Sequence, residues 1–453
     1  MKLLSARTGL LITLILLFVL GLAAFAMQYF DSAPAWVEHP SNRHFYTDGK
    51  LSNLGTIYDR GGKALLQMSD GGIKYNEDPA IRTALMHVTG DRDGNVETSI
   101  SSVFKSDLMG WNWLNGAYRF NSEQPTGGTD LTLTLDAGLC AAAYQELRGR
   151  RGAVGVYNYQ TGELICMTSS PSFDPVFPPD LTGESGDYEG VYLNRLFSAA
   201  YTPGSVFKLV TTAAALEQLP DIDKRRFRCN GEMEVEGNMV TCPAAHGELT
   251  LGEALAHSCN TSFARIALEL GAEKLQEYAE RVGFNSAQKV DGIHTIPGRV
   301  ELAHAGKAGL AWAGIGQFTN TANPLNFMSL VGAIGNRGLA VAPNIVARRG
   351  FLPAASAGAK KRLLSENTAE ALAKMMRNNT IAVYGESNFK GLELCAKSGT
   401  AEVGEGKKPH SWFAGFLDRS DYPLAFVVII EGGGSGSGSA AAVASAVLHR
   451  AVK

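Results

Sequence analysis

The sequence lacks an excess of charge, internal repeats and the common zinc-hydrolase motif. Its 41 Lys and Arg residues are balanced by 44 Asp and Glu residues, which argues against a nucleic-acid-binding protein because such proteins carry a basic surplus. No low-complexity tract and no repeat of about 20–50 residues is present. H-E-x-x-H does not occur, which argues against a metalloenzyme. Hydrophobic residues make up 45% of the chain, too many for a disordered protein and enough for a packed core.

Long hydrophobic runs are also scarce, and only Gly9–Met27 is long enough to cross a membrane. As a helix, this uncharged run would span about 28 Å. Lys2 and Arg7 precede it and Asp31 follows it, so the positive-inside rule predicts a cytoplasmic N-terminus and an extracytoplasmic body. The alternative is a cleaved signal peptide, because Ala24–Ala26 resembles a small-x-small cleavage site. The run exceeds a typical signal-peptide core, so we favour a retained, single-pass anchor in the cell membrane.

The order of predicted elements indicates a mixed α/β protein on a membrane tether. We expect residues 1–29 to form a cytoplasmic tip and transmembrane anchor, residues 30–150 a short pedestal, and residues 151–453 one main domain. In this domain a strand hairpin precedes a long helical middle, and three strands and a final helix follow. Its sheet therefore takes strands from both ends of the segment. The predicted strands are 153–157, 163–168, 392–403, 412–416 and 424–431, and the predicted final helix is 440–452.

The stretch YTPGSVFK places a serine and a lysine at the start of an apolar helix. Pro203 and Gly204 break the chain, so Ser205 lies at the predicted helix N-terminus, where backbone N–H groups favour a developing oxyanion. Lys208 lies three residues on and shares a helix face with Ser205. Because the run around Lys208 is apolar, burial should lower its pKa, and a neutral amine can activate a serine nucleophile. The alternative is a helix-capping serine and a lysine that extends to the surface.

Two further short motifs carry polar side chains at breaks in predicted elements. In Ser258-Cys259-Asn260, which interrupts a helical segment, the serine can relay a proton and the asparagine can hold a substrate amide or orient Lys208. Both residues could instead simply cap helices. The KSGT motif, Lys397–Thr400, interrupts a predicted strand, and its glycine permits close backbone approach to a ligand. This motif suits a carboxylate-bearing substrate that adds to the sheet as a strand; the alternative is a solvated edge strand with a protective lysine.

Three cysteines and one histidine form a further set with the spacing C-x12-C-x3-H-x12-C. They are zinc-capable ligand types, although the spacing does not match a recognised zinc finger. Three states stay open for them: a zinc site, a Cys229–Cys242 disulfide, or free thiols. The four residues are Cys229, Cys242, His246 and Cys259.

Taken in order, S-x-x-K, S-x-N and K-S-G-T resemble the active-site set of penicillin-binding proteins and serine β-lactamases. GTIYDRGGKALL, residues 55–66, resembles the N-terminal signature of class B penicillin-binding proteins, with Leu54 in place of the usual Arg. Val206 stands where Thr is common after the nucleophile, a change that should not disturb the chemistry inside an apolar helix. Longer stretches resemble the transpeptidase domain of this class, namely residues 152–175, 194–208, 314–338, 396–403 and 410–418.

This resemblance implies a five-stranded antiparallel sheet flanked by helices, an all-helical subdomain and no cofactor. It implies that the nucleophile attacks the penultimate D-Ala of a stem peptide, with backbone N–H groups of Ser205 and Thr400 as the oxyanion hole. The implied catalytic residues, which handle the transferred proton, are Ser205, Lys208, Ser258 and Lys397. The implied substrate-binding residues, which hold the stem amide and the D-Ala carboxylate, are Asn260, Ser398, Gly399 and Thr400.

The implied function is a serine D,D-transpeptidase that cross-links peptidoglycan stem peptides and is acylated by β-lactams. Residues 30–150 are too short for a glycosyltransferase module and lack its acidic pattern, so a membrane-embedded glycan polymerase of the shape, elongation or division type is the expected partner. A D,D-carboxypeptidase and a serine β-lactamase are alternatives, but no clear E-x-x-x-N-type loop for fast deacylation lies near the S-x-N motif. A further alternative is a non-catalytic β-lactam sensor or scaffold.

Overall fold

The computed structural model describes residues 2–37, 46–47, 50–51, 54–69, 72–110, 128–181, 186–350, 352–353, 358–404 and 406–453. These residues belong to two compact units. Unit 1 comprises Met1–Ile57, Leu66–Lys74 and Phe104–Leu131, and unit 2 comprises Tyr58–Leu65, Tyr75–Val103 and Thr132–Lys453. The chain passes from one unit to the other within four strands and once more after α4 (Ile100–Val103). The strands are β3 (Thr56–Tyr58), β4 (Ala64–Ser69), β5 (Gly72–Tyr75) and β6 (Leu131–Leu133).

Unit 1 contains one long helix, α1 (Lys2–Val37), with the hairpin of β1 (Tyr46–Thr47) and β2 (Lys50–Leu51) and the short helix α5 (Lys105–Leu108). Within α1, the candidate span is Arg7–Tyr29; its most apolar 18-residue window has a mean hydropathy of 2.9, and none of that window is buried. An apolar helical segment of this length with no buried residue suits a lipid environment. In the described part of the chain it is the one helix apolar and long enough to cross a membrane.

The centre of unit 2 is a five-stranded antiparallel sheet in the order β19-β20-β21-β7-β8. Strands far apart in the sequence meet at its middle, where β21 pairs with β7 and Ile430 lies opposite Gly152. All seven residues of β21 are buried, as expected for a strand covered on both faces. The predicted mixed α/β class and five-stranded sheet are confirmed. The strands are β7 (Gly152–Asn158), β8 (Leu164–Ser170), β19 (Leu394–Ala401), β20 (His410–Leu417) and β21 (Leu424–Ile430).

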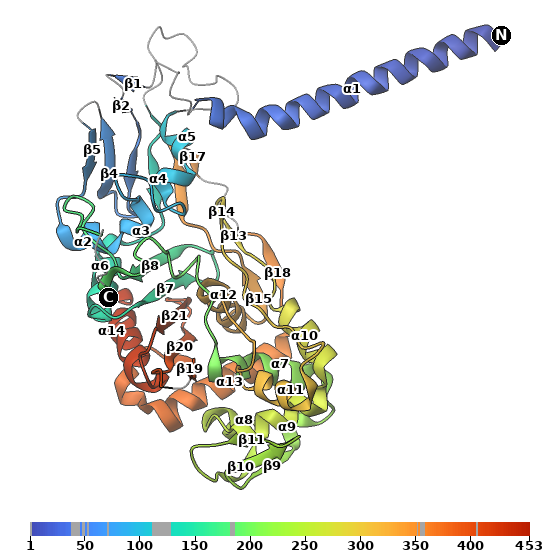
Figure 1. The fold of residues 1–453 in the computed structure, drawn as a ribbon, viewed down its shortest axis with the longest axis vertical. Coiled ribbons are helices and arrows are strands. Elements are labelled where there is room, and N and C mark those ends of the chain that lie inside the picture. The colour runs from blue at the N-terminus through green and yellow to red at the C-terminus, as the bar shows by residue number, and fades with distance from the viewer. Residues whose placement is uncertain are drawn as a thin grey trace. The chain divides into compact units, whose positions relative to one another are not determined.

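Helices cover both faces of this sheet (Figure 1). On one face lies α12 (Pro324–Gly335), whose Phe327 ring packs edge-to-face with Trp412 of β20 at 6.0 Å. The next residue, Phe413, points to the opposite face and stacks on Phe389 at 5.8 Å. This face is covered by α6 (Ala137–Leu147) and α14 (Ala441–Ala451). The period-two alternation of side chains in β20 thus supplies both layers of the core.

The middle of the sequence forms a mostly helical part of unit 2. Its helices are α7 (Lys208–Gln218), α8 (Leu251–Ala256), α9 (Asn260–Leu270), α10 (Ala272–Arg281), α11 (Gly306–Gly314) and α13 (Glu366–Asn379). Two small sheets lie beside these helices, which the prediction of an all-helical subdomain did not include because their strands are short and polar. They are β9 (Arg226–Cys229) with β12 (Gly247–Thr250), and β10 (Glu232–Val235) with β11 (Asn238–Thr241).

The other elements are short. The helices among them are α2 (Pro79–Ala84), α3 (Met86–Thr89), α4 (Ile100–Val103), η2 (Gly186–Tyr188), η3 (Gly204–Phe207), η4 (Ile222–Lys224), η5 (Thr380–Gly385), η6 (Glu386–Phe389) and η7 (Gly436–Ala440). The strands are β13 (Lys289–Val290), β14 (Ile293–His294), β15 (Leu339–Val341), β16 (Val346–Arg349), β17 (Leu352–Pro353) and β18 (Lys360–Arg362).

Candidate active site

Ser205 lies in η3, a 3-10 turn that leads directly into α7. The turn packs closely against the edge strand β19, because a Cβ atom at Gly204 would lie only 2.6 Å from the carbonyl oxygen of Thr400. Gly204 also has a φ of +54°, in the left-handed region that glycine adopts without strain. The Pro-Gly sequence before the serine therefore does more than end the preceding segment. It allows Ser205, which is half-buried, to lie next to the KSGT strand.

Lys208 is the first residue of α7 and is completely buried. Its Nζ atom lies 3.0 Å from Oγ of Ser205 and 3.0 Å from Oγ of Ser258. The carbonyl oxygen of Ser258 is 2.6 Å away and Oδ1 of Asn260 is 2.7 Å away. The S-x-x-K and S-x-N motifs, 50 residues apart along the chain, thus converge on one amine.

The surroundings of Lys208 favour a neutral amine. Burial lowers its pKa well below the usual lysine value, and the charge of Lys397 lowers it further. Nδ2 of Asn260 donates to the Thr241 carbonyl at 2.7 Å, which leaves Oδ1 facing the amine as an acceptor. The carbonyl of Ser258 and Oδ1 of Asn260 can therefore accept the two N–H bonds of a neutral amine. Its lone pair then remains available to take the hydroxyl proton of Ser205.

The S-x-N loop is placed by two helix ends. Thr250 and Glu253 form a capping box that starts α8, and α9 begins at Asn260. Between the two helices, Ser258 has a φ of +54°, a conformation that costs a residue with a side chain about 1–3 kcal/mol. Its Oγ atom lies between two lysines, 3.0 Å from Nζ of Lys208 and 3.3 Å from Nζ of Lys397. The loop thus holds a hydroxyl where it can pass a proton from one amine toward the other.

Lys397 is also buried, and burial lowers its pKa to about 7. Its Nζ atom donates to the Ser398 carbonyl at 2.8 Å, which holds the side chain against its own strand. This strand, β19, lies at one edge of the five-stranded sheet. A sheet edge can accept an extended peptide as an additional strand.

The glycine of KSGT brings β19 close to the nucleophile turn. A Cβ atom at Gly399 would lie 2.8 Å from the Pro203 carbonyl oxygen and 3.1 Å from Cβ of Trp412. The flanking residues carry hydroxyls: Ser398 is half-buried, and Thr400 is exposed with its Oγ1 accepting from the Gly436 N–H at 3.4 Å. The three residues thus form a polar edge beside Ser205.

Sequence reasoning did not identify two residues that support this edge. The hydroxyl of Tyr384, in η5, donates to Oγ of Ser398 at 3.1 Å and accepts from the Ser398 N–H at 2.8 Å. Trp412 of β20 donates from Nε1 to the Thr202 carbonyl at 3.0 Å, which ties the sheet to the segment before the nucleophile. Neither residue stands at a motif spacing that would have indicated its role. Both contacts depend on how distant segments pack.

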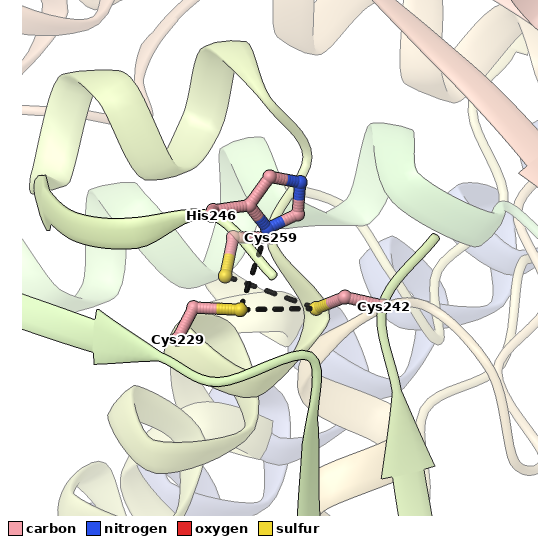
Figure 2. A group of neighbouring side chains, drawn as sticks. All are labelled: Cys229, Cys242, His246 and Cys259. Carbon is pink, nitrogen blue, oxygen red and sulfur yellow. Dashed lines mark hydrogen bonds between the residues drawn. The ribbon is translucent and has the colours of Figure 1, made fainter. Parts of the chain in front are cut away.

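The structure thus brings the predicted catalytic and substrate-binding residues together, while the role assigned to each stays a prediction. The catalytic set is linked through the Lys208 and Lys397 amines, and the substrate-binding set lies on the same loop and strand. The cysteine and histidine set also converges, with its ligand atoms all within 4.8 Å of one another (Figure 2). These residues are Cys229, Cys242, His246 and Cys259.

Comparisons with known proteins identify the family of the chain. Residues 152–449 match the family model described as the penicillin binding protein transpeptidase domain. The chain is 28% identical over 364 residues to "Peptidoglycan D,D-transpeptidase PbpA" of Mycolicibacterium smegmatis, covering 73% of each chain. It is similar to the D,D-transpeptidase domain of a peptidoglycan glycosyltransferase from Eggerthella lenta, with a TM-score of 0.74, 27% identity, and coverage of 88% of this chain and 98% of that one.

A ceftriaxone acyl-enzyme complex of penicillin-binding protein A from M. tuberculosis shares the fold, with a TM-score of 0.77, 23% identity, and coverage of 89% of this chain and 99% of that one. Fold and site therefore define a serine acyltransferase of the penicillin-binding class. The chain belongs to the penicillin-binding protein transpeptidase family, whose model matches more than half of its length. The family, fold class and enzyme class predicted from the sequence are confirmed.

Proposed function

We propose that this chain is a peptidoglycan D,D-transpeptidase that forms an acyl-enzyme on Ser205 and is the target of β-lactams. One observation carries the proposal: the buried amine of Lys208 lies 3.0 Å from the hydroxyls of both Ser205 and Ser258. This geometry places one base between a nucleophile and a proton relay. The family membership and the name of the M. smegmatis relative support the same reaction.

In the acylation step, Oγ of Ser205 attacks the carbonyl carbon of the penultimate D-Ala, and its proton passes to the neutral amine of Lys208. The developing oxyanion is stabilised by the N–H groups of Ser205 and Thr400, and one such donor is worth about 2.7–4 kcal/mol in other enzymes. As the C–N bond breaks, Ser258 gives its proton to the leaving D-Ala nitrogen. Lys208 or Lys397 then returns a proton to Ser258, since both amines contact its hydroxyl.

The donor peptide lies along the edge of β19, where the hydroxyls of Ser398 and Thr400 hold the carboxylate of the terminal D-Ala. Asn260 has a mainly orienting role, because its amide is already engaged by Lys208 and the Thr241 carbonyl. One N–H of its Nδ2 remains for a stem carbonyl. The amino group of a neighbouring stem then attacks the acyl-enzyme, which forms the cross-link and frees Ser205.

The finer assignments concern the membrane and the partner. We propose that α1 anchors the chain with its N-terminus in the cytoplasm, because the basic residues Lys2 and Arg7 lie on that side of the apolar segment. Residues 30–150 then form the pedestal and residues 151–453 the extracytoplasmic transpeptidase domain. A membrane-embedded glycan polymerase of the shape, elongation or division type supplies the strands to be cross-linked.

The test is incubation of the full-length chain in detergent with a D-Ala-D-Ala stem peptide and an acceptor amine, followed by mass spectrometry. We expect a cross-linked product that requires Ser205 and is lost in Ser205→Ala. Trimmed donor without a cross-link would favour a D,D-carboxypeptidase, and turnover of nitrocefin would favour a β-lactamase. A chain that acylates without turning over either peptide or β-lactam would favour a sensor or scaffold.

A further inference from the structure

The Cys/His cluster, defined as Cys229, Cys242, His246 and Cys259, has the geometry of a tetrahedral metal site (Figure 2). Zinc–sulfur bonds of about 2.3 Å at tetrahedral angles place two sulfurs about 3.8 Å apart. The observed Sγ–Sγ distances are 3.7 Å for Cys229 and Cys242 and 3.9 Å for Cys242 and Cys259. A zinc-bound sulfur and imidazole nitrogen should lie about 3.6 Å apart, and Sγ of Cys229 is 3.4 Å from Nδ1 of His246.

The atoms around the cluster suit ligands that carry negative charge. The backbone N–H of Thr261 donates to Sγ of Cys242 at 3.4 Å, and the Ser262 hydroxyl donates to Sγ of Cys259 at 3.1 Å. Hydrogen bonds from an outer shell to the ligating sulfurs are a regular feature of metal–thiolate sites. A disulfide would use only two of the three sulfurs and would leave His246 without a function.

Three of the four ligands come from the ends of short strands in two small sheets. Cys229 ends β9, Cys242 follows β11, and His246 precedes β12. Two-stranded sheets of four residues per strand are marginally stable on their own. Cys259 comes instead from the turn between α8 and α9 and is the middle residue of the S-x-N motif.

We propose that this cluster binds one Zn²⁺ as a closed structural site that clamps the β9–β12 segment to the S-x-N loop. Three thiolates and one imidazole form a soft donor set that selects zinc over magnesium or calcium. With four protein ligands the ion keeps no open position, so it takes no part in the bond-forming steps. Its effect on catalysis is positional. It holds Cys259, and through the flanking residues it fixes Ser258 and Asn260 against Lys208.

The first test measures metal content and does not depend on activity. The full-length chain, purified in detergent without chelators, should contain about one zinc per chain by mass spectrometry of the metal. Cys229→Ala should reduce this content about fivefold or more, since a three-ligand site binds more weakly. Cys166→Ala is the matched control, because Cys166 is equally buried but lies in β8, outside the cluster, and its variant should keep the metal.

A cobalt replacement keeps the test decisive if Cys229→Ala fails to fold. The wild-type chain, stripped of zinc and loaded with Co²⁺, should show the visible bands of a tetrahedral ion and a sulfur-to-cobalt charge-transfer band. Absence of zinc from the native chain together with an octahedral cobalt spectrum would overturn the proposal. So would a disulfide between any two of the three cysteines in the freshly isolated chain.

The positional effect rests on the proposed function, and its test separates the two proposals. Chelation should slow acylation by a fluorescent penicillin about tenfold, and Zn²⁺ but not Mg²⁺ should restore the rate. An unchanged rate after complete zinc removal would refute the clamp while leaving the acyl-enzyme proposal intact. A chain that contains zinc but never acylates would refute the proposed function while leaving the metal site intact.

Discussion

Asn260 and Lys208 form a directed contact in which the amide oxygen accepts a hydrogen bond from the buried amine. Oδ1 of Asn260 lies 2.7 Å from Nζ of Lys208, and the orientation of the amide is fixed by its other end, which donates to Thr241. The amide oxygen is uncharged, so it accepts a hydrogen bond from the Lys208 amine without placing a negative charge beside it. Ser258, two residues before Asn260 in the S-x-N motif, contacts the same amine. One short loop therefore positions two of the residues that contact Lys208.

Asn260→Asp tests whether the base works as a neutral amine. A carboxylate in place of the amide would lie close to Nζ of Lys208 and stabilise the ammonium, which raises the lysine pKa. Less neutral amine would then be present at neutral pH, so the acidic limb of the acylation profile should move to higher pH. The rate of labelling by a fluorescent penicillin, measured between about pH 6 and 10, shows the shift. Asn238→Asp, on exposed β11, should leave the profile unchanged. An unmoved profile in Asn260→Asp would argue against the neutral amine.

Ser205→Ala should abolish labelling by a fluorescent penicillin, and Lys208→Ala should slow it by about 10²–10⁴, the usual contribution of a general base. In the wild-type chain the reaction should proceed at pH 7. An ordinary lysine would be neutral there in roughly one molecule in 3,000, whereas burial lowers the pKa of Lys208. Lys274→Ala, at an exposed position of α10, is the control. Normal labelling of Lys208→Ala at neutral pH would remove it as the base.

Gly399→Ala should displace β19 from the nucleophile turn. The added methyl group would lie 2.8 Å from the Pro203 carbonyl oxygen, which is backbone and cannot rotate away. Forcing extra volume into a packed region costs about 1–3 kcal/mol, so we expect a lower melting temperature and much slower acylation. Gly252→Ala serves for comparison, because in α8 the nearest atom to the added Cβ is a side-chain carbon of Met375 at 3.6 Å. Equal stability and activity of the two variants would contradict the close approach.

Tyr384→Phe removes the hydroxyl that both donates to Oγ of Ser398 and accepts from its N–H. Losing one such hydrogen bond costs about 0.5–1.5 kcal/mol. If Ser398 holds the donor carboxylate, its loss of orientation should raise KM for the stem peptide more than it lowers kcat. Steady-state kinetics measure the changes in KM and kcat separately. Tyr422→Phe is the control, because it also removes a tyrosine hydroxyl and keeps the ring. A fall in kcat alone would indicate that Tyr384 acts on the chemical step instead.

Much of the fold could be predicted because its signals are local. The run Gly9–Met27 indicated a span from apolarity alone, and it lies within α1. The predicted strands 153–157 and 424–431 correspond to β7 and β21. The strands β9–β12 were not predicted, because four-residue polar strands carry too few residues for an alternating pattern to emerge.

The amino-acid order by itself determined which chemical groups the site contains, since S-x-x-K, S-x-N and K-S-G-T are read directly from the sequence and set a serine beside a lysine on one turn. Only tertiary structure decided that Lys208 contacts Asn260, that Tyr384 contacts Ser398, and that three cysteines and a histidine form one cluster. The physical reason is distance along the chain. Contacts between neighbours follow from helix and strand periods, whereas contacts between remote segments depend on how the whole core packs.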